Sequence, residues 1–136
     1  SEDLKYRPSP EAMSVYETLI HIHGLSKTIY NTTSSKPNSR PYKNVPEDFK
    51  SIRIATLDYL EKAANSFFDK SSQEISEMKI IFDSNGKIRS FPLWNLLNGQ
   101  IADVIYHTGQ IVSFRRTTGN SIEKGVNVFI GKTKEF

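Results

Sequence analysis

Three segments of this chain space their apolar residues as an amphipathic helix does, and this pattern constrains the fold more than any other feature. The first segment has its stripe at Val15, Leu19, Ile22, Ser26 and Ile29. Ser14 and Glu17 form the sequence pattern of a capping box at its start. We therefore predict a helix from about Val15 to Tyr30.

A loop rich in Ser, Pro and Asn is predicted from Asn31 to about Val45. Three prolines in and after this segment oppose helix, and Pro46 suits the first turn of the second helix, which we expect to end near Asp69. The apolar stripe of the second helix is Phe49, Ile52, Thr56, Tyr59, Leu60, Ala63 and Phe67.

The remaining sequence predicts a small hairpin, a third helix and an extended tail. Asn85-Gly86 separates two short apolar stretches, which indicates a hairpin turn. Pro92 is expected at the start of the third helix, apolar residues follow from Leu93 to Phe114, and Gly119 is expected to stop it. Residues 126–131 alternate as in a strand or an extended arm. We find no repeat and no domain boundary, so we predict one all-α domain over residues 1–136.

Composition excludes several kinds of chemistry. The chain has 136 residues and no cysteine, which rules out disulfides, thiolate zinc sites and a cysteine nucleophile. Any metal must be bound by histidine and carboxylate. The net charge is +3 with no dense basic stripe, so we expect no nucleic-acid partner. No apolar run reaches the ~20 residues of a membrane span, so we expect a cytoplasmic protein without membrane contact.

A helical wheel of the third helix separates an apolar side from a mixed stripe. We predict that Leu93, Leu97, Val104, Thr108 and Ile111 face the core. The stripe beside them is Leu96, Gln100, Asp103, His107, Gln110 and Phe114. Asp103 and His107 are four residues apart, so both side chains project from one face and can bind one ion. Tyr106 lies on the far side of the wheel and is not predicted to be a site residue.

The residues alone favour a simpler alternative, in which Asp103 and His107 form an ordinary ion pair. The other histidines, His21 and His23, flank the apolar stripe of the first helix on opposite sides. Periodicity does not decide which of them turns toward the third helix.

Two segments resemble the DinB-like family. Residues 13–22, which include His21, are similar to the helix with that family's first metal histidine. Residues 103–110 and 115–120 are similar to the family's late helix, where His-x3-His is followed by Gly-Gln, an Arg and a closing Gly. Residues 91–94 resemble the Pro and aromatic that open that helix. The resemblance covers roughly residues 5 to 131.

The resemblance implies an up-down four-helix bundle with a divalent metal site. Matched residue by residue, the ligands are His21, Asp103 and His107, with Asp103 in place of the commoner histidine. A carboxylate still binds a divalent ion and shifts the preference toward harder metals among zinc, nickel, manganese and iron. Gln100 and Gln110 are expected to bind substrate or to support the ligands.

The function implied by the resemblance is that of a metal-dependent enzyme, since the family includes thiol-dependent S-transferases and isomerases. A transferase, or a related hydrolase or isomerase, would act on a small molecule such as a low-molecular-weight thiol. One alternative is a non-catalytic dimeric bundle for binding or stress response, with a degenerate metal site. Another is a small-molecule cleft without metal.

The number of long helices adds an expectation about packing. The family's first helix precedes the Pro-rich segment that begins here at Arg7-Pro8, so three of the four long helices are expected in this sequence. An apolar groove should then stay open unless an N-terminal helix outside the sequence, or the second chain of a homodimer, fills it.

Overall fold

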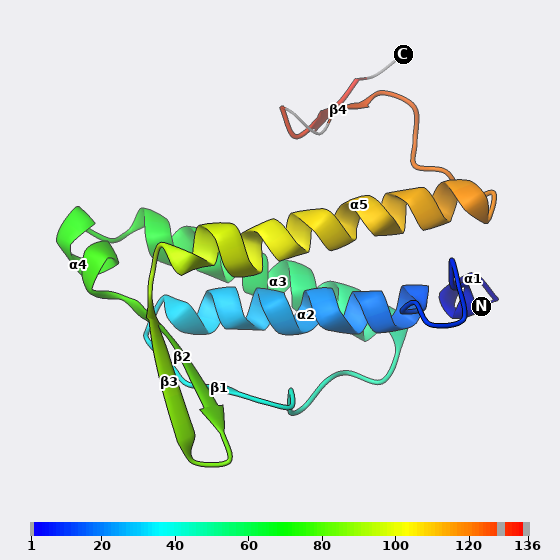
Figure 1. Ribbon diagram of the computed structural model, residues 1–136. Helices are drawn as coiled ribbons and strands as arrows, with labels where there is room; N and C mark the ends of the chain where they lie inside the picture. Colours follow the sequence, from blue (N-terminus) through cyan, green and yellow to red (C-terminus); the bar gives the residue numbers. More distant parts are fainter. Residues whose placement is uncertain (1, 128–129, 135–136) are drawn as a thin grey trace.

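Most of the chain is helical, and its three long helices lie side by side (Figure 1). The computed structural model describes residues 2–127 and 130–134. The helices are α1 (Glu2–Lys5), α2 (Val15–Thr32), α3 (Phe49–Phe68), α4 (Ser72–Glu77), the π-helix η1 (Leu97–Ile101) and α5 (Ala102–Thr117). The strands are β1 (Asn38–Ser39), β2 (Lys79–Ser84), β3 (Lys87–Pro92), β4 (Val126–Asn127) and β5 (Lys132–Thr133). The fold is therefore mainly helical with small sheets, rather than all-α.

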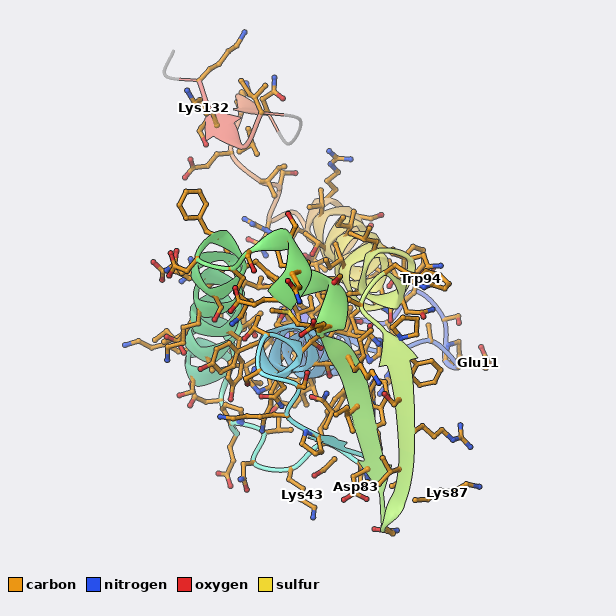
Figure 2. All side chains as sticks on the ribbon, turned by 90° about the vertical axis from the view of Figure 1, so that its left-hand side faces the viewer. Glu11, Lys43, Asp83, Lys87, Trp94 and Lys132 are labelled. Atoms are coloured by element: carbon orange, nitrogen blue, oxygen red, sulfur yellow. The ribbon has the colours of Figure 1, made fainter. Side chains whose placement is uncertain are left out.

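Helix α2 contacts both α3 and α5, and it is buried around more of its circumference than one apolar stripe predicts (Figure 2). Four of its polar residues are at most 1% exposed: Thr18, Ser26, Thr28 and Thr32. Each of their hydroxyls donates to the backbone carbonyl four residues earlier, over 2.8 to 3.0 Å. Because the helix supplies its own acceptors, these side chains lie in the interior without unpaired polar groups.

The apolar core joins the helices to the hairpin. Ile29 of α2, Ala63 of α3 and Ile80 of β2 are buried together with Leu96, which lies just before η1. Partly buried apolar residues surround them: Tyr30, Leu60, Phe67, Phe82, Leu93, Ile101 and Val104. Leu60, Ala63 and Phe67 of the predicted stripe of the second helix face this core, and Ile52 is also buried, whereas Phe49 at its start is 44% exposed.

The predicted hairpin is confirmed. Strands β2 and β3 pair antiparallel, and β1 adds a parallel edge through Asn38 and Phe82. Asn85 and Gly86 have φ of 54° and 85°, as a tight two-residue turn requires. Figure 2 shows the hairpin extending away from the helices, with Asp83 and Lys87 near its tip. At the other end of the chain, β4 pairs with β5, and residues 128–129 of the predicted arm lie outside the described residues.

The third helix begins later than predicted and is interrupted. Pro92 is the last residue of β3, where it lies opposite Lys79, so it does not start the helix. The π-helical turn η1 comes first, and Gly99 within it has φ −106° and ψ −106°, outside the helical region. Helix α5 then runs to Thr117, and Gly119 with φ 83° follows it as the predicted stop.

The face of the third helix that we predicted to be in the core is partly wrong. Leu97 is 69% exposed and Thr108 is exposed, whereas Leu96, His107 and Phe114 are buried. Leu96 before η1 lies in the same stripe of the regular wheel as His107 and Phe114 after it, so the error was the choice of the buried stripe and not the phase of the wheel. The mixed stripe, and not the apolar one, therefore has the buried residues of α5.

Apolar side chains remain exposed on both helices that flank α2. Ile54 and Leu57 of α3 are 55% and 50% exposed, and Ile105 of α5 is 68% exposed. The expected apolar groove, and what would fill it, stay predictions. Within the described ranges, no helix is both long and apolar enough to cross a membrane.

Gly24 of α2 allows a close approach of the Pro-rich loop. A methyl group built at Gly24 would overlap the ring of Tyr42, whereas one built at Gly109 of α5 would meet nothing within 4 Å. The two glycines are both in helices, where alanine is favoured over glycine by up to about 1 kcal/mol. Alanine substitutions at the two positions therefore separate the effect of packing against Tyr42 from the effect of helix propensity.

We predict that Gly24→Ala lowers the free energy of unfolding by about 1–3 kcal/mol, because the Tyr42 ring must move. Gly109→Ala, the matched control, should raise it by up to about 1 kcal/mol. Urea unfolding of both variants measures these changes. A stabilised Gly24→Ala variant would show that the loop does not pack on α2 as described.

His23 is the buried histidine of α2. It is 2% exposed, and its Nδ1 lies 3.3 Å from the hydroxyl oxygen of Thr56. Since that hydroxyl donates to the Ile52 carbonyl, it accepts a hydrogen bond from Nδ1–H of His23. Burial, and secondarily the charge of Lys27, lower the pKa of His23 from its usual 6.5.

The pKa of His23 is lower in the folded state than in the unfolded state, so protonation of His23 favours unfolding. The free energy of unfolding is therefore not reduced by this histidine above pH 6.5, and it decreases as the pH falls below that value. We predict that His23→Gln, which can still donate to Thr56, loses less stability than the parent between pH 7.5 and pH 5. Urea unfolding at several pH values tests this. Identical pH profiles for the two proteins would contradict it.

Candidate metal centre

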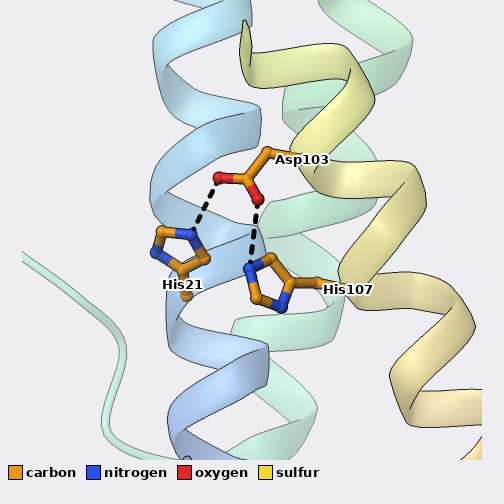
Figure 3. A group of neighbouring side chains, drawn as sticks. All are labelled: His21, Asp103 and His107. Carbon is orange, nitrogen blue, oxygen red and sulfur yellow. Dashed lines mark hydrogen bonds and ion pairs between the residues drawn. The ribbon is translucent and has the colours of Figure 1, made fainter.

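Three side chains from two helices meet beside α2: His21 from α2, and Asp103 and His107 from α5 (Figure 3). Each offers one ligand atom, and these atoms lie within 4.8 Å of one another. Asp103 and His107 converge because they are one helical turn apart, and His21 reaches them across the contact between α2 and α5. The cluster could hold a metal ion.

The carboxylate of Asp103 lies between the two imidazoles. Its Oδ2 is 3.1 Å from Nε2 of His21, and its Oδ1 is 3.2 Å from Nε2 of His107. The two rings meet edge to face with centroids 4.7 Å apart. The side chain of His107 is 9% exposed, whereas those of His21 and Asp103 are 30% and 40% exposed. His107 thus forms the inner side of the cluster, and the other two ligands face outward.

The second nitrogen of His107 is held by Gln110. Nδ1 of His107 lies 2.7 Å from Oε1 of Gln110, whose Nε2 donates to the Tyr106 hydroxyl over 3.2 Å. Gln110 therefore accepts a hydrogen bond from Nδ1–H of His107. In a neutral His107, Nε2 then presents a lone pair to Asp103. Two such acceptors at 3.2 Å repel each other unless a proton or a metal cation lies between them.

This arrangement fits a divalent ion. Two imidazoles and one carboxylate are a common donor set for such ions, and they leave further positions open for water or a substrate. A hydrogen bond from the outer nitrogen of a ligating histidine, as from His107 to Gln110, is also typical of metal sites.

A cleft of about 460 Å³ opens beside the cluster. His21 and Asp103 line it, so two of the three ligands are accessible to a small molecule. The other polar residues that line it are Arg40, Asn98, Gln100 and Tyr106. The cleft lies between α2, η1, the start of α5 and the loop that contains Arg40.

The two predicted substrate residues lie in different places. Gln100, in η1, lines the cleft, and its Oε1 is buried without a hydrogen-bond donor among the described residues. Gln110 lies beyond His107 and orients it. Gln100 is thus placed to contact a ligand of the cleft, and Gln110 is placed to support a ligand of the metal.

Sequence reasoning missed Tyr106 and Arg40. The wheel put Tyr106 on the far side because it assumed the wrong core face, although the i, i+3 spacing from Asp103 would have placed Tyr106 beside it. Arg40 lies in the irregular Pro-rich loop, where no periodicity predicts the direction of a side chain.

The structure also decides between the two histidines of α2. His21 points to Asp103, as the family resemblance implied, and His23 points to Thr56 of α3. The residues are two positions apart, so they face opposite neighbours of the same helix.

Comparison with known proteins identifies the family. A DinB-like protein from Bacillus subtilis, known from a crystal structure, is similar in fold, with a TM-score of 0.59 and 21% identity over 88% of this chain and 77% of that chain. A search of curated proteins matched none. The model of the DinB family matches residues 1–124. The chain therefore belongs to the DinB family.

Proposed function

We propose that this protein binds a divalent metal ion through His21, Asp103 and His107 and is a metal-dependent enzyme. The observation that supports this most directly is that His21, Asp103 and His107 bring three ligand atoms within 4.8 Å of one another, with the outer nitrogen of His107 hydrogen-bonded to Gln110. The adjoining cleft, which two of the ligands line, gives a substrate access to the ion.

A bound divalent ion would polarise a substrate oxygen or lower the pKa of a bound water or thiol, so that a nucleophile exists near neutral pH. The residues around it have separate tasks. Gln110 holds the His107 ring in one orientation, and the buried position of His107 keeps water from that side of the site. Tyr106 accepts from Gln110, so its own proton is free to be donated into the cleft.

The reaction that we infer is transfer of a low-molecular-weight thiol to an electrophile. It rests on membership of the DinB family and on the cluster of His21, Asp103 and His107, in which Asp103 stands in place of the commoner histidine. Mixed nitrogen and oxygen ligation suits zinc, nickel, manganese or iron.

We predict about one divalent ion per chain in protein purified without chelator or affinity tag. Asp103→Ala and His107→Ala should each lose the ion, because two donors alone bind weakly. His23→Gln, the control, should retain it because His23 faces α3. Elemental analysis measures the content, and added metal should raise the melting temperature in a concentration-dependent way. No bound metal under any loading condition would refute the proposal.

The proposed catalytic activity requires a test separate from that of metal binding. The metal-loaded protein should accelerate the reaction of a small thiol with a chromogenic electrophile, and Asp103→Ala should abolish this. Stoichiometric metal without acceleration for any thiol and electrophile pair would favour the non-catalytic binding bundle instead.

We also predict that Gln110→Ala lowers metal affinity by about 10- to 100-fold, because His107 loses the acceptor that holds its ring. Gln110→Glu keeps an acceptor for Nδ1 and should bind metal at least as tightly as the parent. Competition with a chromogenic chelator gives both affinities. Equal losses in the two variants would show that Gln110 does not orient His107 through this hydrogen bond.

A further inference from the structure

Arg40 brings a positive charge to the cleft that no carboxylate neutralises within ion-pair distance in the described part of the chain. Its guanidinium carbon lies 4.2 Å from the centroid of the Tyr42 ring and 5.2 Å from that of Phe82. Its backbone N–H donates to the carbonyl of Asp83 over 3.1 Å. The side chain is therefore held at the cleft by two aromatic rings and an edge of the sheet.

The residues nearest to Arg40 do not supply a negative charge. Burial raises the pKa of Tyr42, and the charge of Arg40 opposes this only in part, so the phenol is neutral. Each oxygen of Asp103 already lies against an imidazole. A partly buried guanidinium without an anion is costly, and its planar fork of donors matches a carboxylate.

The side-chain oxygen of Gln100, which lines the cleft, is a second polar group without a hydrogen-bond partner among the described residues. Oε1 of Gln100 is buried and has no donor among the described residues. A buried acceptor left unpaired costs free energy, so a ligand N–H or O–H group is favoured if the side-chain amide of Gln100 turns its oxygen into the cleft to accept from it. Another carboxylate oxygen at this position would be repelled.

We propose that the cleft selects a small substrate that carries a carboxylate, bound by Arg40, and a neighbouring N–H or O–H group, bound by the side-chain oxygen of Gln100. This deepens the proposed function, on which it rests, because such a ligand lies beside His21 and Asp103 and its reacting group would reach the ion. Among the residues that the structure describes, Arg40 is the only arginine or lysine that lines the cleft, so a monoanionic carboxylate fits better than a doubly charged phosphate.

Three small thiols separate the two contacts. N-acetylcysteine has both the carboxylate and an amide N–H, N-acetylcysteamine lacks the carboxylate, and 3-mercaptopropionate lacks the N–H. We expect N-acetylcysteine to bind most tightly, and each deletion to weaken binding by on the order of 10- to 100-fold. Titration of the ¹⁵N-labelled protein, followed through the side-chain signals of Arg40 and Gln100, measures this in the metal-free and in the zinc-loaded protein.

Variants assign each preference to one residue. Arg40→Gln should bind N-acetylcysteine no better than N-acetylcysteamine, and Arg40→Lys should recover only part of the preference because it lacks the fork. Gln100→Leu should lose the preference for the amide N–H and keep that for the carboxylate. Arg89→Gln is the control, since Arg89 is an exposed arginine of β3 that does not line the cleft.

Arg40 and Gln100 form the proposed substrate subsite, and its test can be separated from that of the metal site. Preferences that depend on Arg40 and Gln100 in protein that binds none of zinc, nickel, manganese and iron would support the subsite and refute the metal-dependent function. Zinc binding without these preferences would refute the subsite alone. An unchanged preference for the carboxylate in a folded Arg40→Gln variant would also overturn the proposal.

Discussion

The structure depends on the burial of a helix that is not especially apolar. Helix α2 lies against α3, α5 and the Pro-rich loop, and its hydroxyls bond to its own carbonyls. Because these polar groups need no outside partner, α2 can be enclosed on several sides at once. That enclosure brings His21 to Asp103 and lets Tyr42 lie against Gly24.

The site extends from this arrangement in two directions. On the inner side, His107 is buried, its Nδ1–H donates to Gln110, and its Nε2 faces the carboxylate of Asp103. On the outer side, His21 and Asp103 reach a cleft whose other walls are η1 and the loop with Arg40. Rigid helices thus position the metal ligands, and irregular segments supply the groups that would contact a substrate.

The errors made from sequence have a common cause. The core was assigned to the most apolar stripe of the helical wheel, that of Leu93 and Leu97, whereas the buried stripe is that of Leu96, His107 and Phe114. The same assumption excluded Tyr106 from the site. Polar residues of the buried stripe pair with one another, as His107 does with Asp103 and Gln110, and an apolar pattern does not register such pairing.

The sequence by itself determined the three helices, the Asn85-Gly86 hairpin turn and the i, i+4 pair of Asp103 and His107, because these depend on neighbours within a few residues. Tertiary structure decided which histidine of α2 meets that pair, which face of α5 is buried and where Arg40 and Gln100 point. These depend on how α2 packs between two helices and a loop. Contacts between segments distant in the chain leave no local periodicity from which they could be predicted.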